Sequence, residues 1–176
     1  MKEYEFRVIL EETTAEYDRL EARLLAAELN DAYVGATDDL LHVDFVRRAR
    51  SPRQAILSAI RDIRSAGFTV NRLDTDELVT AAEIARRTGR SRESIRLLAT
   101  GERGPGGFPP PVGRSLRSRR WRWSEVAPWL ERIGLLERGF SEEARAISAV
   151  NAAIDLLRNA PSSKNRHAII EALQSG

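Results

Sequence analysis

One stretch, residues 78–134, constrains the fold of this chain more than any other, because it combines helix start and stop signals at close spacing. Thr80 is a good N-cap residue, and Glu83 three positions later completes a capping box. Gly89 tolerates the left-handed backbone that ends a helix, and Ser91 can cap a second helix. These signals predict two short helices joined by a tight turn.

The spacing of small and apolar residues predicts that the two helices pack as a helix-turn-helix. Ala85 stands where two helix backbones must approach closely, and Ile84, Ile95 and Leu98 stand on the facing sides. The second helix, at 91–100, then exposes long or hydroxyl-bearing side chains at its N-terminal end. A recognition helix presents that end to base edges in the major groove of DNA.

The next residues predict a basic hairpin and a closing helix. Prolines keep Phe108–Val112 extended, as in an edge strand, and a mobile basic tip follows at 113–120. Residues 121–123 are expected to return as a strand whose tryptophans pack in the core rather than stack on bases. Ser124 is expected to cap a third helix with an apolar stripe of Val126, Trp129, Leu130 and Ile133. A helix-turn-helix followed by a basic hairpin and a closing helix is a winged helix.

Four segments of this stretch carry a resemblance to a known family: TAAEIARRTGRSRESIRLL, FPPPVG, RSRRWRWSEV and APWLERIG. On these residues, the central third of the chain resembles the excisionase and AlpA-type branch of the MerR-like winged-helix proteins. Members of that branch bind DNA as transcription regulators or as directionality factors in phage recombination. The resemblance implies that the helix at 91–100 lies in the major groove and that a wing at 113–120 meets the backbone or the minor groove. With Arg87 and Arg90 expected near the backbone, the candidate DNA-binding residues are Arg87, Arg90, Ser91, Arg92, Ser94, Arg96, Arg114, Ser115, Arg117, Arg119 and Arg120.

The distribution of charge supports a nucleic-acid partner. The net charge of +2 conceals a basic block: residues 80–123 hold 11 basic and three acidic side chains, whereas residues 1–79 carry a net −5 and residues 124–176 a net −1. A basic block that coincides with a predicted helix-turn-helix and wing is the electrostatic signature of a phosphate-binding surface.

Composition excludes several other classes of protein. The chain has no cysteine, so disulfides and thiolate metal sites are ruled out. No apolar run approaches the roughly 18 residues of a membrane span, and the N-terminus does not have the pattern of a signal peptide. A cytoplasmic, nucleoid-associated protein is therefore expected, with no cofactor and no membrane partner.

The N-terminal region predicts an α+β domain over residues 1–76. The expected order is strand, helix, strand, strand, helix, strand, which is the ferredoxin-like arrangement. The predicted elements are strands at 5–11, 32–37, 40–47 and 68–73, and helices at 15–30 and from Ser51-Pro52 to Gly67. One sheet face would stay uncovered and could serve as a dimer, partner or ligand surface; on it, His42 and Asp44 point the same way and could form a hydrogen bond.

Two further segments complete the predicted organisation, which has a winged helix at 77–135 and a helical hairpin at 136–176. The hairpin would begin at Ser141 and continue with a last helix from about Ser163. Both helices are amphipathic and need a surface to pack on. Dimerisation, which the resemblance favours, and packing against another part of the chain remain open.

The function expected from these features is sequence-specific binding of double-stranded DNA by a dimeric transcriptional regulator. In this hypothesis Arg92 and Arg96 read guanines or grip phosphates, and Glu93 pairs with a neighbouring arginine. Two alternatives are an excisionase-like factor that bends DNA, and an antitoxin or other protein whose N-terminal domain binds a protein partner. An enzyme is disfavoured, because the two histidines are not clustered and no phosphate-cradling glycine motif is present.

Overall fold

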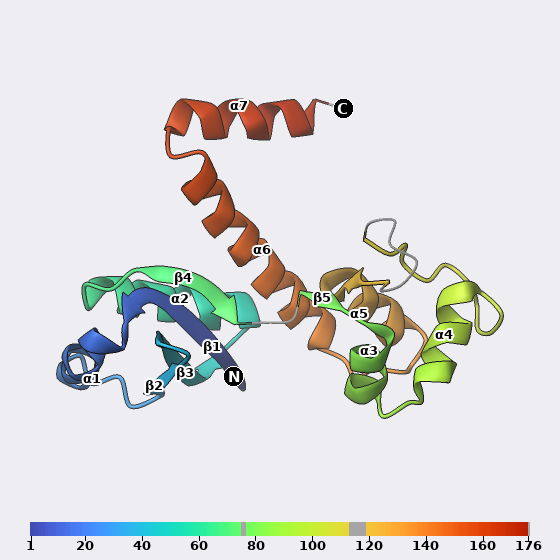
Figure 1. The fold of residues 1–176 in the computed structure, drawn as a ribbon, viewed down its shortest axis with the longest axis horizontal. Coiled ribbons are helices and arrows are strands. Elements are labelled where there is room, and N and C mark those ends of the chain that lie inside the picture. The colour runs from blue at the N-terminus through green and yellow to red at the C-terminus, as the bar shows by residue number, and fades with distance from the viewer. Residues whose placement is uncertain (75–76, 113–118, 176) are drawn as a thin grey trace. The chain divides into compact units, whose positions relative to one another are not determined.

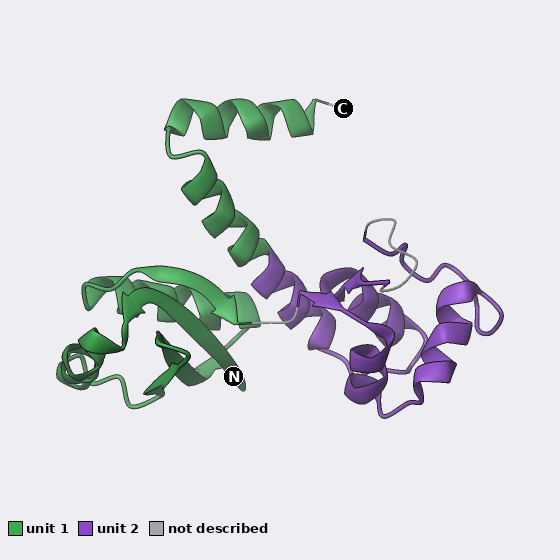
Figure 2. Ribbon diagram, viewed as in Figure 1, with its two compact units in different colours: residues 1–74, 149–176 green, residues 75–148 purple. Residues whose placement is uncertain are grey.

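The computed structural model describes residues 1–74, 77–112 and 119–175, which form a mixed α+β protein with an antiparallel sheet, as expected (Figure 1). The chain divides into two compact units, residues 1–74 with 149–176 and residues 75–148 (Figure 2). The segment 136–176, expected to form a separate hairpin, is divided between these units. Helix α6 (Phe140–Asn159) contributes residues to both.

The first unit contains a four-stranded antiparallel sheet in the order β2-β3-β1-β4. The strands are β1 (Lys2–Thr13), β2 (Ala32–Thr37), β3 (Leu40–Ala49) and β4 (Val70–Asp74). Asp38 and Asp39 join β2 to β3 with φ values of 50° and 64°. Two consecutive positive φ values are typical of a tight hairpin turn, in which aspartate is tolerated.

Two helices, α1 (Tyr17–Ala26) and α2 (Pro52–Ser65), pack against the sheet and bury its alternating apolar side chains. Ser51 caps α2 by accepting a hydrogen bond from the Gln54 N–H, as its position before Pro52 predicted. The expected helix at 15–30 is shorter than predicted, because Glu28 adopts a φ of 55° just after α1 ends. The core side chains of this unit include Val8, Leu10, Leu20, Leu41, Val43, Phe45, Ile56, Ile63 and Leu73.

The outer sheet face has a different polar pairing from the one expected. Arg7, directly opposite Asp44 in the β1–β3 register, donates two hydrogen bonds to its carboxylate at 2.6 and 2.9 Å. The His42 Nε2 atom lies 3.7 Å from the nearer Asp44 oxygen, too far for a hydrogen bond. The suggested His42–Asp44 hydrogen bond is therefore wrong, and Asp44 pairs with Arg7 of the neighbouring strand instead.

The C-terminal half of α6 covers the edge of this sheet. The buried Asn151 side chain accepts from the Leu73 N–H at 2.8 Å and donates to the Leu73 carbonyl at 3.1 Å. Two turns later, Arg158 donates to the Asn71 carbonyl and to the Glu11 carboxylate, both at 3.2 Å. Polar side chains of the helix thus occupy backbone groups that an edge strand otherwise leaves without partners.

The second unit is built from short elements around an apolar core. Strand β5 (Leu78–Val79) pairs with β6 (Trp121–Arg122), and α3 (Ala81–Thr88), α4 (Arg92–Thr100) and α5 (Trp123–Arg132) surround them. The largest contributors to the core are the three tryptophans, which are at most 7% exposed. The core residues from α3, α4 and α5 include Ile84, Ala85, Ile95, Leu98, Val126, Trp129 and Leu130.

Three predictions for the second unit need correction. Phe108–Val112 is not a strand: only Val112 forms a bridge, with Arg120, because the three preceding prolines have no N–H to donate. The pairing partner of β6 is β5, which the sequence did not reveal. Helix α5 begins at Trp123 with Arg122 at the N-cap position, so Ser124 does not cap it.

The last two helices differ in how they are held. The N-terminus of α6 is capped by α5, since the Glu131 carboxylate accepts from the backbone N–H groups of Gly139 and Ser141 at 2.9 and 2.8 Å. Helix α7 (Ser163–Gln174) buries none of its described side chains. No helix in the described part of the chain is both long and apolar enough to cross a membrane.

Candidate nucleic-acid interface

Local capping orients the two helices of the candidate interface. The Thr80 Oγ1 atom accepts from the Glu83 N–H at 3.3 Å, and the Glu83 carboxylate accepts from the Thr80 N–H at 2.5 Å, so the predicted capping box is present. Gly89 ends α3 with a φ of 63°. Ser91 starts α4 by accepting from the Ser94 N–H at 3.1 Å. Three residues, 89–91, therefore complete the turn between α3 and α4.

Burial of the inner helix faces determines which side chains of α4 remain available. Ile95 and Leu98 are at most 5% exposed and share a core with Ile84 of α3. Arg92, Glu93 and Arg96 are exposed on the opposite side of the helix. These three side chains are exposed as expected, whereas Ser94, which was also expected to be exposed, is half-buried.

A groove of about 890 Å³ runs along this charged face. Its basic side chains are Arg92 and Arg96 of α4 and Arg119, which precedes β6. Its other walls come from the N-terminus of α3, the C-terminal turn of α4 and the buried Trp121. The lining residues are Thr80, Ala81, Ala82, Arg92, Glu93, Arg96, Ala99, Thr100, Arg119 and Trp121.

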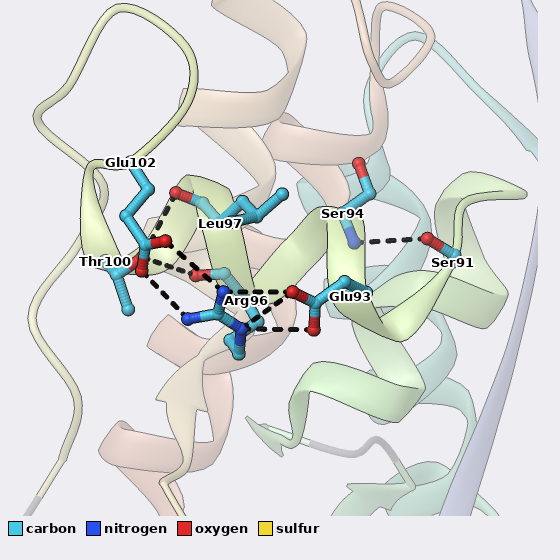
Figure 3. Close-up of polar contacts among 7 residues, drawn as sticks. All are labelled: Ser91, Glu93, Ser94, Arg96, Leu97, Thr100 and Glu102. Atoms are coloured by element: carbon cyan, nitrogen blue, oxygen red, sulfur yellow. Dashed lines mark hydrogen bonds and ion pairs between the residues drawn. The ribbon is translucent and has the colours of Figure 1, made fainter.

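Arg96 lies at the centre of an ion-pair network on this face, drawn in Figure 3. Its Nε atom donates to Glu93 at 3.0 Å, and its Nη1 atom donates to Glu102 at 2.8 Å. Hydrogen bonds from Arg96 hold the pKa of both carboxyl groups below their ordinary value. The expected pairing of Glu93 with a neighbouring arginine is present.

The loop that carries Glu102 is held against α4 and α5. The backbone N–H groups of Gly101 and Arg103 donate to α4 carbonyls at 3.3 and 3.1 Å, which places Glu102 over the last turn of the helix. Further along the loop, the Trp129 indole N–H donates to the Gly106 carbonyl at 3.1 Å. The segment between α4 and Phe108 is therefore anchored at both ends.

The remaining predicted interface residues fall into different places. Arg87 stacks its guanidinium 4.6 Å from the centre of the Trp123 ring and lines a separate hollow of about 350 Å³ beside Phe140. Arg90 is exposed in the turn, and Arg120 pairs its backbone with Val112. The predicted residues Arg114, Ser115 and Arg117 lie outside the described residues.

Two contributors to the interface were missed from the sequence. Glu102 is not among the predicted interface residues; its signal is the glycine before it, because Gly101 ends α4 with a left-handed backbone and lets the chain fold back over the last turn. The pairing of β5 with β6, which brings Arg119 beside α4, had no recognisable signal in two-residue strands. Among the described residues, no group of three His, Cys, Asp or Glu side chains is arranged to hold a metal ion.

Comparison of the chain with protein-family models, with curated proteins and with solved structures found no match. The functional assignment therefore depends on the geometry of the groove and on the charge around it.

Proposed function

We propose that this chain binds double-stranded DNA in a sequence-specific manner and acts as a transcriptional regulator. The observation that carries the proposal is the groove of about 890 Å³ in which Arg92 and Arg96 of α4 meet Arg119. Three guanidinium groups from two segments, separated by more than 20 positions in the chain, face one hollow beside a helix N-terminus. Such an arrangement suits the phosphate backbone and the base edges that flank it.

The roles follow from the chemistry of each side chain. In this proposal α3 and α4 are a helix-turn-helix, and α4 enters the major groove with Arg92 and Arg96 towards base edges. Arginine forms two hydrogen bonds to guanine, a contact that discriminates by about 1–3 kcal/mol against a wrong base. Arg119 and Arg120, which precede β6, contact phosphates and supply affinity without sequence preference.

The first unit supplies the features expected of a regulatory domain. Its element order and its antiparallel sheet in the order β2-β3-β1-β4 support the proposal that it is a ferredoxin-like domain. The outer sheet face exposes Tyr33 and Val46 at 60% and 40% beside the Arg7–Asp44 pair. Apolar side chains that flank a defined ion pair suit a protein surface, so this face is proposed to hold a second copy of the chain or a protein partner.

The proposal is tested by fluorescence anisotropy with purified protein. One duplex comes from the chain's own upstream region, and the other is a scrambled duplex of equal length and composition, titrated at several salt concentrations. The wild-type chain should prefer the upstream duplex. Arg92→Ala/Arg96→Ala should remove that preference, whereas Arg119→Ala/Arg120→Ala should weaken both duplexes alike and reduce the salt dependence by about 0.9 per lost phosphate contact.

A matched control separates the groove from the general effect of charge. Arg138→Ala/Arg145→Ala removes two exposed arginines of the same unit that do not line the groove, and it should change affinity little. Equal binding of the two duplexes by the wild-type chain would contradict sequence-specific binding. Strong bending of a bound duplex, measured by energy transfer between its ends, would favour the architectural alternative over regulation.

A further inference from the structure

A guanidinium group can form paired hydrogen bonds along two edges, a side edge of Nε and Nη2 and an end edge of Nη1 and Nη2. In Arg96 a carboxylate occupies each of these edges (Figure 3). Glu93 takes the side edge, with contacts of 3.0 Å to Nε and 2.9 Å to Nη2. Glu102 takes the end edge, with contacts of 2.8 Å to Nη1 and 3.3 Å to Nη2. In the free protein, the base-reading residue proposed above is therefore already engaged on both edges.

The two carboxylates are attached to the helix differently. Glu93 is in α4 itself, three residues before Arg96, so both side chains project from one rigid face. Glu102 lies beyond the helix end, and its carboxylate also accepts from the Thr100 hydroxyl at 2.8 Å. Both carboxylates are more than half exposed, so either can be displaced without opening the core.

The geometry at the end edge resembles that of a base contact. A carboxylate offers two acceptor oxygens in one plane, and guanine offers its O6 and N7 acceptors in the same way, so both can fill the Nη1 and Nη2 donors of an arginine. The carboxylate that remains on Nε would keep the guanidinium aligned. A lone phosphate, in contrast, must approach against the negative charge of both glutamates.

We infer that Glu102 is a competitor built into the chain for the base-reading edge of Arg96, and that Glu93 is the residue that positions the same guanidinium for guanine. This inference rests on the proposed function. On DNA that lacks a suitably placed guanine, Glu102 stays hydrogen-bonded to Arg96. Where the DNA sequence supplies a guanine at the right position, the base replaces Glu102 on the Nη1 and Nη2 donors. Glu102 thereby lowers the affinity of α4 for both kinds of DNA, and Glu93 sharpens the preference of α4 for its own site.

The test compares Glu102→Gln with Glu93→Gln, which remove the same charge from the same network. Anisotropy titrations use the upstream and scrambled duplexes described above, and a circular dichroism melt verifies that each variant folds. Glu102→Gln should tighten binding to both duplexes by about two- to five-fold, the range of a released surface ion pair. Glu93→Gln should tighten binding only to the scrambled duplex, so that the preference for the upstream duplex falls.

A third variant leaves the charge unchanged. Thr100→Val removes the hydroxyl that holds the Glu102 carboxylate while preserving the shape of the side chain. It should change affinity in the same direction as Glu102→Gln and by less. A long-range charge effect would leave this variant identical to the wild-type chain.

The outcomes separate this inference from the proposed function. If the wild-type chain prefers the upstream duplex but Glu102→Gln and Glu93→Gln change both affinities equally, the network acts only through net charge and the inference is overturned. If none of the three variants differs from the wild-type chain, Arg96 is not restrained and the inference is also overturned. If the wild-type chain shows no preference between the duplexes, the proposed function fails first.

Discussion

Replacing Asn151 by alanine should destabilise the first unit selectively. The Asn151 side chain is 8% exposed, and Leu73, the residue it bonds, is fully buried. Its amide fills one donor and one acceptor of the β4 backbone, at 2.8 and 3.1 Å. Alanine removes both partners at once and leaves the edge of the sheet with an N–H and a carbonyl that have lost their bonds to α6.

The magnitude follows from those two groups. A buried backbone group that loses its hydrogen-bond partner costs about 1–3 kcal/mol, and two such groups cost about 2–6 kcal/mol if water does not replace the amide. The higher helix propensity of alanine offsets about 0.5 kcal/mol. Because water can enter at the edge of a sheet, we expect a decrease of about 2–3 kcal/mol in the free energy of unfolding.

The aromatic residues allow the two units to be followed separately. All three tyrosines lie in the first unit and all three tryptophans lie in the second. Urea denaturation is therefore followed by near-ultraviolet circular dichroism of tyrosine and by tryptophan fluorescence in the same samples. Asn151→Ala should shift the tyrosine transition, and the matched variant Asn159→Ala, at the exposed end of the same helix, should not. A loss below about 0.5 kcal/mol, or one equal to that of Asn159→Ala, would refute the reasoning.

Three further predictions concern single contacts. Burial lowers the pKa of His42 below its ordinary value of 6.5, so the unfolded chain binds more protons, and the free energy of unfolding should fall as the pH drops below about 6.5. His42→Gln should reduce the difference in the free energy of unfolding between about pH 7.5 and 5.5, measured by urea titration. An unchanged difference would contradict the role of His42. Gly35→Ala places a Cβ atom 2.2 Å from His42 Nε2 and should lower the free energy of unfolding by about 1–3 kcal/mol. Adding His42→Ala to the same chain should restore most of that loss, because it removes the clashing ring. Losses that simply add in the double variant would exclude the clash. Glu131→Ala removes the acceptor for the N–H groups of Gly139 and Ser141. It should lower the free energy of unfolding of the second unit by about 1–2 kcal/mol, measured by tryptophan fluorescence. An unchanged free energy of unfolding would show that water replaces the carboxylate and would contradict the prediction.

The helix boundaries that the sequence predicted well are those specified by neighbouring residues. Thr80 and Glu83 form the capping box, Ser91 caps α4, and Gly89 has the left-handed backbone that its position required. Each of these contacts spans at most three residues, so residue type and spacing are sufficient to recognise it.

The predictions that failed depended on the competition between local preference and tertiary contacts. Ser124 is a good N-cap residue by type, but pairing of β6 with β5 starts α5 at Trp123. Asp44 stands two residues from His42 on one strand, but Arg7 from the neighbouring strand reaches its carboxylate first. Local propensity is a weak guide wherever a partner distant in sequence offers a stronger contact.

For the candidate interface, the sequence by itself determined the basic block, the two capped helices and the identity of the exposed residues on α4. Periodicity and capping are local properties, and charge is a property of composition. Only the tertiary structure showed that Arg119 shares a groove with Arg92, that Arg87 stacks on Trp123, and that Glu102 closes the end of Arg96. These contacts join residues that the chain brings together only after its core has formed, and spacing along a helix identifies a partner for an exposed charge only within that helix.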